Sequence, residues 1–109
     1  MDHRTQHRIH AAIPAQIHGV DAMGQSFEDS VEAIEVSRRG LSFFTRRELQ
    51  EISQLTVVLP GRGPVRPGEG PTDFYCEAAV VRVVKEGDAN RVSVRFMGAT
   101  LSTYTSETP

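Results

Sequence analysis

Near its C-terminal end the chain reads FYCEAAVVRVV over residues 74–84. Apolar side chains fall on both faces of this run when it is extended, which is typical of a central or strongly bent strand. Residues 87–90, GDAN, are turn formers, and Val92, Val94 and Phe96 then alternate with polar residues. The order of strand, turn and strand predicts a β-hairpin.

A second β signal lies near the N-terminus. Over residues 9–18 apolar side chains recur at every second position, and this period of two predicts a half-buried strand. Pro14 lies on the polar face of that strand. Because proline has no N–H to donate, this indicates an edge position or a bulge. Residues 19–25 then read as a turn. The apolar positions are Ile9, Ala11, Ile13, Ala15 and Ile17.

Residues 26–37 fit two different structures. Phe27, Val31 and Ile34 have the spacing of a helix face. As a strand, the segment needs a bulge near Ala33 to keep its apolar side chains on consistent faces. The β segments on both sides favour the bent strand.

The middle of the chain predicts two more strands and one helical turn. Residues 40–44, GLSFF, are short and apolar, and residues 55–59 restart the alternation. Between them, TRRE at residues 45–48 has the form of a capping box. Leu49 and Ile52 would form the apolar side of one helical turn.

Six short strands with one short helical turn, and no long helices between them, predict an all-β fold. A small antiparallel barrel or a sandwich suits this spacing of strands. Residues 61–73 contain four Gly and three Pro, which predicts a mobile loop. After Gly98 the apolar period is lost, as in a loose tail. A length of 109 residues suggests one domain.

Composition argues against several classes of protein. Twelve basic and fourteen acidic residues give a net charge of −2, so bulk charge favours neither a nucleic acid polymer nor a membrane as partner. No apolar run is long enough for membrane insertion as a helix, and the polar N-terminus is unlike a secretory signal. Cys76, the single cysteine, cannot form an internal disulfide, so the reduced cytoplasm is the expected compartment.

Patterns for catalysis or metal binding are weak. Asp2, His3 and His7 could be drawn as metal ligands, but no scaffold is visible to hold them. Cys76 lies in a valine-rich strand, where burial makes a thiol inert. Without a convergent acid–base set, the sequence predicts a binding protein and not an enzyme. A core of this size also leaves no room for a large cofactor, and none is expected.

The arginines are more informative, since they make up eleven of the twelve basic residues. Arg4 and Arg8 precede the first strand, and Arg38 and Arg39 lie in EVSRRG, residues 35–40. Arginine suits bidentate contact with phosphate and stacking on flat rings. An ordinary solvated surface explains either pair taken alone.

Taken together, Arg4-x-x-x-Arg8 and Glu35-x-Ser37-x-x-Gly40 resemble the paired signature of PilZ domains. The strand pattern around the two motifs resembles that family over nearly the whole chain. The resemblance implies a stand-alone, six-stranded antiparallel β-barrel that binds the bacterial second messenger cyclic di-GMP.

The resemblance also implies a role for each motif residue. Arg4 and Arg8 would contact the phosphates and stack on or hydrogen-bond guanine. Ser37 would offer its hydroxyl, and Gly40 would allow a tight turn and a close approach to the ligand. Glu35 stands where the family has Asp or Asn. Either its longer side chain still accepts hydrogen bonds from the guanine edge, or it points to solvent and leaves a weak or silent site.

By the same resemblance the chain divides into a flexible arm (residues 1–9), a barrel (9–98) and a tail (99–109). The tail lacks the pattern of the helix that many family members pack on the barrel. Two functions remain open. One is a receptor that passes a ligand-induced conformational change to a protein partner; the other is a degenerate adaptor that binds a protein without the nucleotide. Glu35 favours the adaptor, and the four other motif residues favour the receptor.

Overall fold

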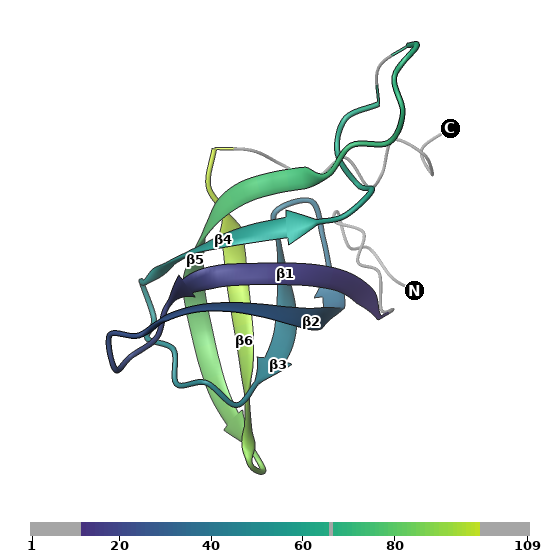
Figure 1. Ribbon diagram of the computed structural model, residues 1–109. Helices are drawn as coiled ribbons and strands as arrows, with labels where there is room; N and C mark the ends of the chain where they lie inside the picture. The colour runs from purple at the N-terminus through teal and green to yellow at the C-terminus, as the bar shows by residue number, and fades with distance from the viewer. Residues whose placement is uncertain (1–11, 66, 99–109) are drawn as a thin grey trace.

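The computed structural model describes residues 12–65 and 67–98, which form six antiparallel strands (Figure 1). The strands close into a barrel in the order β1-β2-β3-β6-β5-β4. The all-β prediction is therefore confirmed, and the sheet is a closed barrel and not a sandwich. The strand bounds are β1 Ile13–Val20, β2 Ser26–Val36, β3 Gly40–Thr45, β4 Gln54–Leu59, β5 Phe74–Glu86 and β6 Ala89–Phe96.

Alternation along each strand builds the core. In β1, Ile13, Ala15 and Ile17 are buried while Pro14 and Gln16 are exposed, as the period of two predicts. Burying one such aliphatic side chain stabilises the fold by roughly 1.5–3 kcal/mol. The largest fully buried side chains are Phe43, Ile17, Leu55, Leu59, Val36, Val57, Val80 and Val92.

Two strands are bent by β-bulges. The register of β2 against β3 shifts between Ala33 and Glu35, which confirms the bent strand and excludes the helix for residues 26–36. The register of β5 against β6 shifts between Val80 and Arg82, so the long apolar run is a strongly bent strand. Because a bulge increases local twist, both bends help a short sheet to close on itself.

At Pro14, strand β1 pairs with β2 but not with β4. The β1–β2 pairing runs from Ile13 to Val20, whereas the β1–β4 pairing covers Gln16 to Gly19. One side of β1 is therefore an edge at Pro14, which confirms the edge position predicted for a residue without an N–H.

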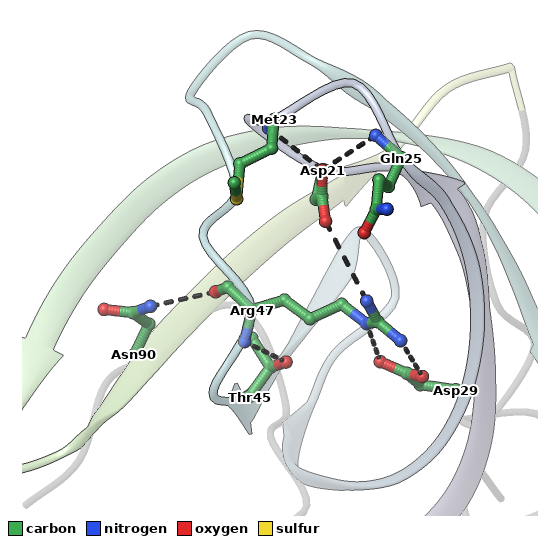
Figure 2. Close-up of polar contacts among 7 residues, drawn as sticks. All are labelled: Asp21, Met23, Gln25, Asp29, Thr45, Arg47 and Asn90. Atoms are coloured by element: carbon green, nitrogen blue, oxygen red, sulfur yellow. Dashed lines mark hydrogen bonds and ion pairs between the residues drawn. The ribbon is translucent and has the colours of Figure 1, made fainter.

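The β1–β2 turn begins later than the sequence predicts. Gly19 and Val20 still pair with β2, so the predicted start at residue 19 is wrong by two residues. Asp21 closes the turn, because its Oδ1 accepts hydrogen bonds from the N–H groups of Met23 at 2.9 Å and Gln25 at 3.0 Å (Figure 2). An aspartate favours such a turn by bonding the backbone two residues on.

The β5–β6 hairpin is confirmed, with a shorter turn than predicted. Glu86 pairs with Ala89, so only Gly87 and Asp88 stand between the paired residues. Gly87 has a positive φ of 65°, which glycine adopts at little cost and which favours it at the first central position of a two-residue turn.

The predicted helical turn over residues 45–52 is wrong. In the part of the chain that the structure describes, the segment after Thr45 is an irregular loop between β3 and β4. Leu49 is buried, but Ile52 is 86% exposed with a φ of 76°. Oγ1 of Thr45 accepts from the N–H of Arg47 at 3.1 Å, two residues on instead of the three of a capping box.

Tertiary contacts explain why the segment between β3 and β4 forms a loop and not a helical turn. Arg47 donates from Nε and Nη2 to the Asp29 carboxylate, and its guanidinium lies 4.5 Å from the centre of the Phe27 ring. The side chain of buried Asn90 donates to the Arg47 carbonyl at 2.9 Å (Figure 2). In a helix that carbonyl would accept from the N–H four residues on. Contacts to β2 and β6 therefore hold the loop in addition to its own short-range hydrogen bonds.

The chain leaves the barrel between β4 and β5 as a long loop (Figure 1). Its base is tied by a hydrogen bond from the Gly63 N–H to the Thr72 carbonyl, and by another from the Gly61 N–H to the Asp73 carboxylate, both at 2.9 Å. The mobility of residues 61–73 stays a prediction.

Several sequence predictions lie outside the described residues. These are the arm over residues 1–9, the strand start at Ile9 and Ala11, and the tail over residues 99–109. The three-part division of the chain therefore stays a prediction. Within residues 12–65 and 67–98, no helix is long and apolar enough to cross a membrane.

Candidate functional site

Three residues, Ser37, Arg38 and Arg39, link β2 to β3. Ser37 organises this loop: its N–H donates to the Gly40 carbonyl at 2.9 Å, and its hydroxyl lies 3.4 Å from the same oxygen. The N–H of Arg39 donates to the Ser37 hydroxyl at 3.3 Å. The loop is therefore tight, and both arginine residues are exposed.

Gly40 is required by packing. A Cβ on this residue would lie 2.0 Å from the carbonyl oxygen of Val94 in β6. Its φ is not in the left-handed region, so the close approach to a neighbouring strand, and not a special turn conformation, demands glycine here. The structure thus gives this motif glycine a reason that needs no ligand.

A cleft of about 310 Å³ opens beside the β2–β3 loop. It brings together Glu35, Ser37 and Gly40, the three motif residues that the structure describes. The other two, Arg4 and Arg8, lie outside the described residues. The full lining is Glu35, Ser37, Arg39, Gly40, Leu41, Ser42, Ser93, Val94 and Arg95.

Strand register supplies lining residues that the sequence reasoning missed. Ser42 of β3 pairs with Ser93 of β6, and their hydroxyl oxygens share a hydrogen bond of 2.9 Å. Gly40 pairs with Arg95, which places that arginine at the cleft as well. The available signal was the alternation in β6, where Ser93 and Arg95 alternate with core residues.

Charge in the cleft favours an anion. Arg39 and Arg95 contribute two positive charges to the lining, against one negative charge from Glu35. Guanidinium groups stay protonated at any physiological pH and match the oxygen geometry of phosphate. The hydroxyls of Ser37, Ser42 and Ser93 add hydrogen-bonding capacity to the same lining.

The side chain of Glu35 is partly buried and contacts an arginine of β6. This side chain is 21% exposed, and its Oε1 lies 3.8 Å from Nη2 of Arg91 in β6. Arg91 is a second residue that the sequence reasoning missed, since it lies 56 positions further along the chain and outside both motifs.

Two other residues with shifted pKa values, Cys76 and Asp29, have structural roles. Cys76 is buried, and burial raises the pKa of its thiol, which suits an inert core residue. The hydrogen bond from Arg47 lowers the pKa of the Asp29 carboxyl, but that pair ties the β3–β4 loop to β2 (Figure 2). Among residues 12–65 and 67–98, no cluster of His, Cys, Asp and Glu could hold a metal ion.

The described residues thus form a six-stranded barrel with an arginine-bearing cleft beside its β2–β3 loop. The PilZ domain family model matches residues 2–106, and the chain belongs to this family. No curated protein sequence matches the chain.

Two solved structures are similar to the chain. One is the Bacillus subtilis inhibitor of motility, MotI/DgrA, with a TM-score of 0.66 and 17% identity over 97% of this chain. This chain spans about half, 47%, of that longer one. The other is the PilZ domain of YcgR from Escherichia coli, determined with c-di-GMP, with a TM-score of 0.53 and 19% identity. That match covers 89% of this chain and 79% of the other. At these identities the likeness establishes the fold alone.

Proposed function

We propose that this protein is a receptor for cyclic di-GMP. The observation that carries the proposal is the cleft, which gathers Glu35, Ser37 and Gly40 of the motif with Arg39 and Arg95. The ligand has two phosphodiester charges and two flat guanine bases. Family membership and the c-di-GMP bound to the YcgR domain support the same ligand class.

Each group of the site has a task in this proposal. Arg39 and Arg95 attract the phosphates, while Arg4 and Arg8 close over the ligand from the N-terminal arm. Guanine donates hydrogen bonds from N1–H and N2–H₂, and the Glu35 carboxylate accepts them. The Ser37 hydroxyl already bonds the loop backbone and keeps a further lone pair for the ligand.

The proposed output is a change of surface and not a reaction. In this proposal the Glu35 carboxylate and the serine hydroxyls of the lining bind the ligand and take part in no reaction. Ordering of the arm over bound ligand would create or cover a surface for a protein partner, because a ligand stabilises the conformation that it prefers. We propose that this signalling takes place in the bacterial cytoplasm.

Calorimetric titration with cyclic di-GMP tests the receptor function. Wild type should bind, and Arg8→Ala should bind about tenfold to a hundredfold more weakly, since one charge-assisted hydrogen bond contributes about 1.5–3 kcal/mol. Arg46→Ala is the matched control, because Arg46 is 80% exposed and pairs with Asp88 away from the cleft lining. No binding by wild type at high micromolar ligand would refute the receptor function.

One observation favours a second function, a PilZ adaptor that binds a protein without nucleotide. Glu35 replaces the usual Asp or Asn, and its carboxylate is engaged by Arg91. If this contact withdraws the carboxylate from the guanine edge, the guanine N1–H and N2–H₂ lose their acceptor. The same titration separates the two functions, because the adaptor would not respond to the nucleotide.

A further inference from the structure

Glu35 reaches past its neighbouring strand to Arg91. Glu35 pairs in register with Ser42 of β3, whereas Arg91 lies in β6, on the far side of β3. Two strand spacings, together with an offset of two residues along the strands, separate their backbones by about 12 Å. Nevertheless Oε1 of Glu35 lies 3.8 Å from Nη2 of Arg91, so the contact uses the length of both side chains.

The extra methylene of glutamate makes this contact. An aspartate at position 35 would end one carbon–carbon bond earlier, about 1.5 Å. The gap to Arg91 would then grow to about 5 Å, beyond ion-pair distance. The contact therefore gives Glu35, in place of the family's Asp or Asn, a physical role in this chain.

Arg91 is not among the residues that line the cleft, although it contacts Glu35, which is. The hydroxyls of Ser42 and Ser93, which share their 2.9 Å hydrogen bond, line the cleft beside Glu35 and form a polar floor. Ser42 is buried, so neighbouring atoms of the barrel restrict the position of its hydroxyl. Arg91 can therefore act on a ligand in the cleft through the Glu35 carboxylate that it contacts, besides its general positive charge.

We propose that Arg91 is a positioning residue for nucleotide binding, which holds the Glu35 carboxylate over the serine floor and offsets its charge. This inference rests on the proposed function. A carboxylate beside a ligand with two negative charges repels it, and a guanidinium at 3.8 Å reduces that repulsion. A carboxylate also has about four lone-pair sites, so Glu35 can accept from guanine while its Oε1 faces Arg91.

The expected effect is moderate. The Glu35 side chain is 21% exposed and that of Arg91 is 38% exposed, so solvent screens the pair in part. Partly exposed pairs of this kind change affinity by about twofold to fivefold, less than a direct contact to the ligand. Removing Arg91 should weaken binding, because the Glu35 carboxylate then repels the ligand phosphates more strongly.

A double-mutant cycle tests the inference on the full chain, with cyclic di-GMP titrated by calorimetry. Arg91→Gln should weaken binding about twofold to fivefold when Glu35 is present. In the Glu35→Gln background the same change should alter affinity by less than about twofold, since no carboxylate remains to be positioned. Arg91→Lys should restore part of the loss, because it keeps the charge without the planar fork.

Arg82→Gln is the matched control. Arg82 is an exposed arginine of β5, paired in register with Ser93, and it does not line the cleft. Its removal takes away one positive charge near the same floor, so it measures general electrostatic attraction. We expect Arg82→Gln to weaken binding less than Arg91→Gln, and equally in both Glu35 backgrounds.

Each outcome bears on one claim. If wild type binds and Arg91→Gln binds equally well, or more tightly, the positioning role is wrong while the receptor function stands. An equal loss with Glu35 and with Gln at position 35 also contradicts it. If wild type does not bind, the receptor function and this role fall together. Far-UV circular dichroism checks folding, and Arg91→Met, which keeps most of the apolar stem, replaces Arg91→Gln if that variant unfolds.

Discussion

Replacing Gly40 with alanine would place a methyl group against the backbone of β6. The added Cβ would lie 2.0 Å from the Val94 carbonyl oxygen, 3.1 Å from its carbonyl carbon and 3.2 Å from Cα of Arg95. Ordinary contact begins near 3.4 Å, so β3 and β6 would have to separate locally by about 1.4 Å, from 2.0 to 3.4 Å. All three atoms belong to the backbone, and no flexible side chain can yield instead.

The cost of that separation follows from two terms. Overpacking of a well-packed site costs about 1–3 kcal/mol. The movement also strains the hydrogen bonds at this end of β3, such as that from the Phe96 N–H to the Arg39 carbonyl at 2.7 Å, and losing one costs about 1 kcal/mol. Alanine offsets about 0.4–1 kcal/mol of this cost, because it restricts the unfolded chain more than glycine does. We expect Gly40→Ala to lower the free energy of unfolding by about 2–3 kcal/mol, a drop of roughly 10–20 °C in Tm.

Urea denaturation followed by far-UV circular dichroism measures this loss. Gly70→Ala is the matched control, because a Cβ on Gly70 meets no atom within 4 Å and its φ is not positive. That variant should stay within about 0.5 kcal/mol of wild type. If Gly40→Ala were as stable as Gly70→Ala, the packing explanation for the motif glycine would be refuted, and its role would have to be sought in ligand contact.

Two further predictions concern the loop between β3 and β4. Because the hydrogen bond from Arg47 lowers the pKa of Asp29, the stability that this carboxyl provides is present above its unfolded pKa of about 3.9 and is lost as pH falls through the lower folded value. The urea midpoint of wild type should therefore fall more between about pH 5 and pH 2 than that of Asp29→Asn, and parallel pH profiles would contradict this. Ile52 has a left-handed φ of 76°, so Ile52→Gly should raise the free energy of unfolding by about 0.5–1 kcal/mol in thermal melts. Val65→Gly, at an exposed residue without positive φ, should bring no such gain.

Local sequence determined the strands and the bends in β2 and β5. The alternation of Ile13, Ala15 and Ile17 sets which side chains face the core, and burying them requires an extended chain with a period of two. The bulge near Ala33 was predictable because apolar residues change face at that point. The spacing of the two motifs singled out five residues, and the structure brings the three that it describes, Glu35, Ser37 and Gly40, to one cleft.

Only the tertiary structure decided the rest of the cleft and the β3–β4 loop. Ser42 meets Ser93, and Glu35 meets Arg91, across more than fifty residues of chain, through a strand register that no local pattern encodes. The capping-box pattern after Thr45 predicted a helical turn, but contacts to β2 and β6 hold that segment as a loop. Propensity within one turn contributes only tenths of a kcal/mol per residue, so packing and hydrogen bonds to distant strands outweigh it.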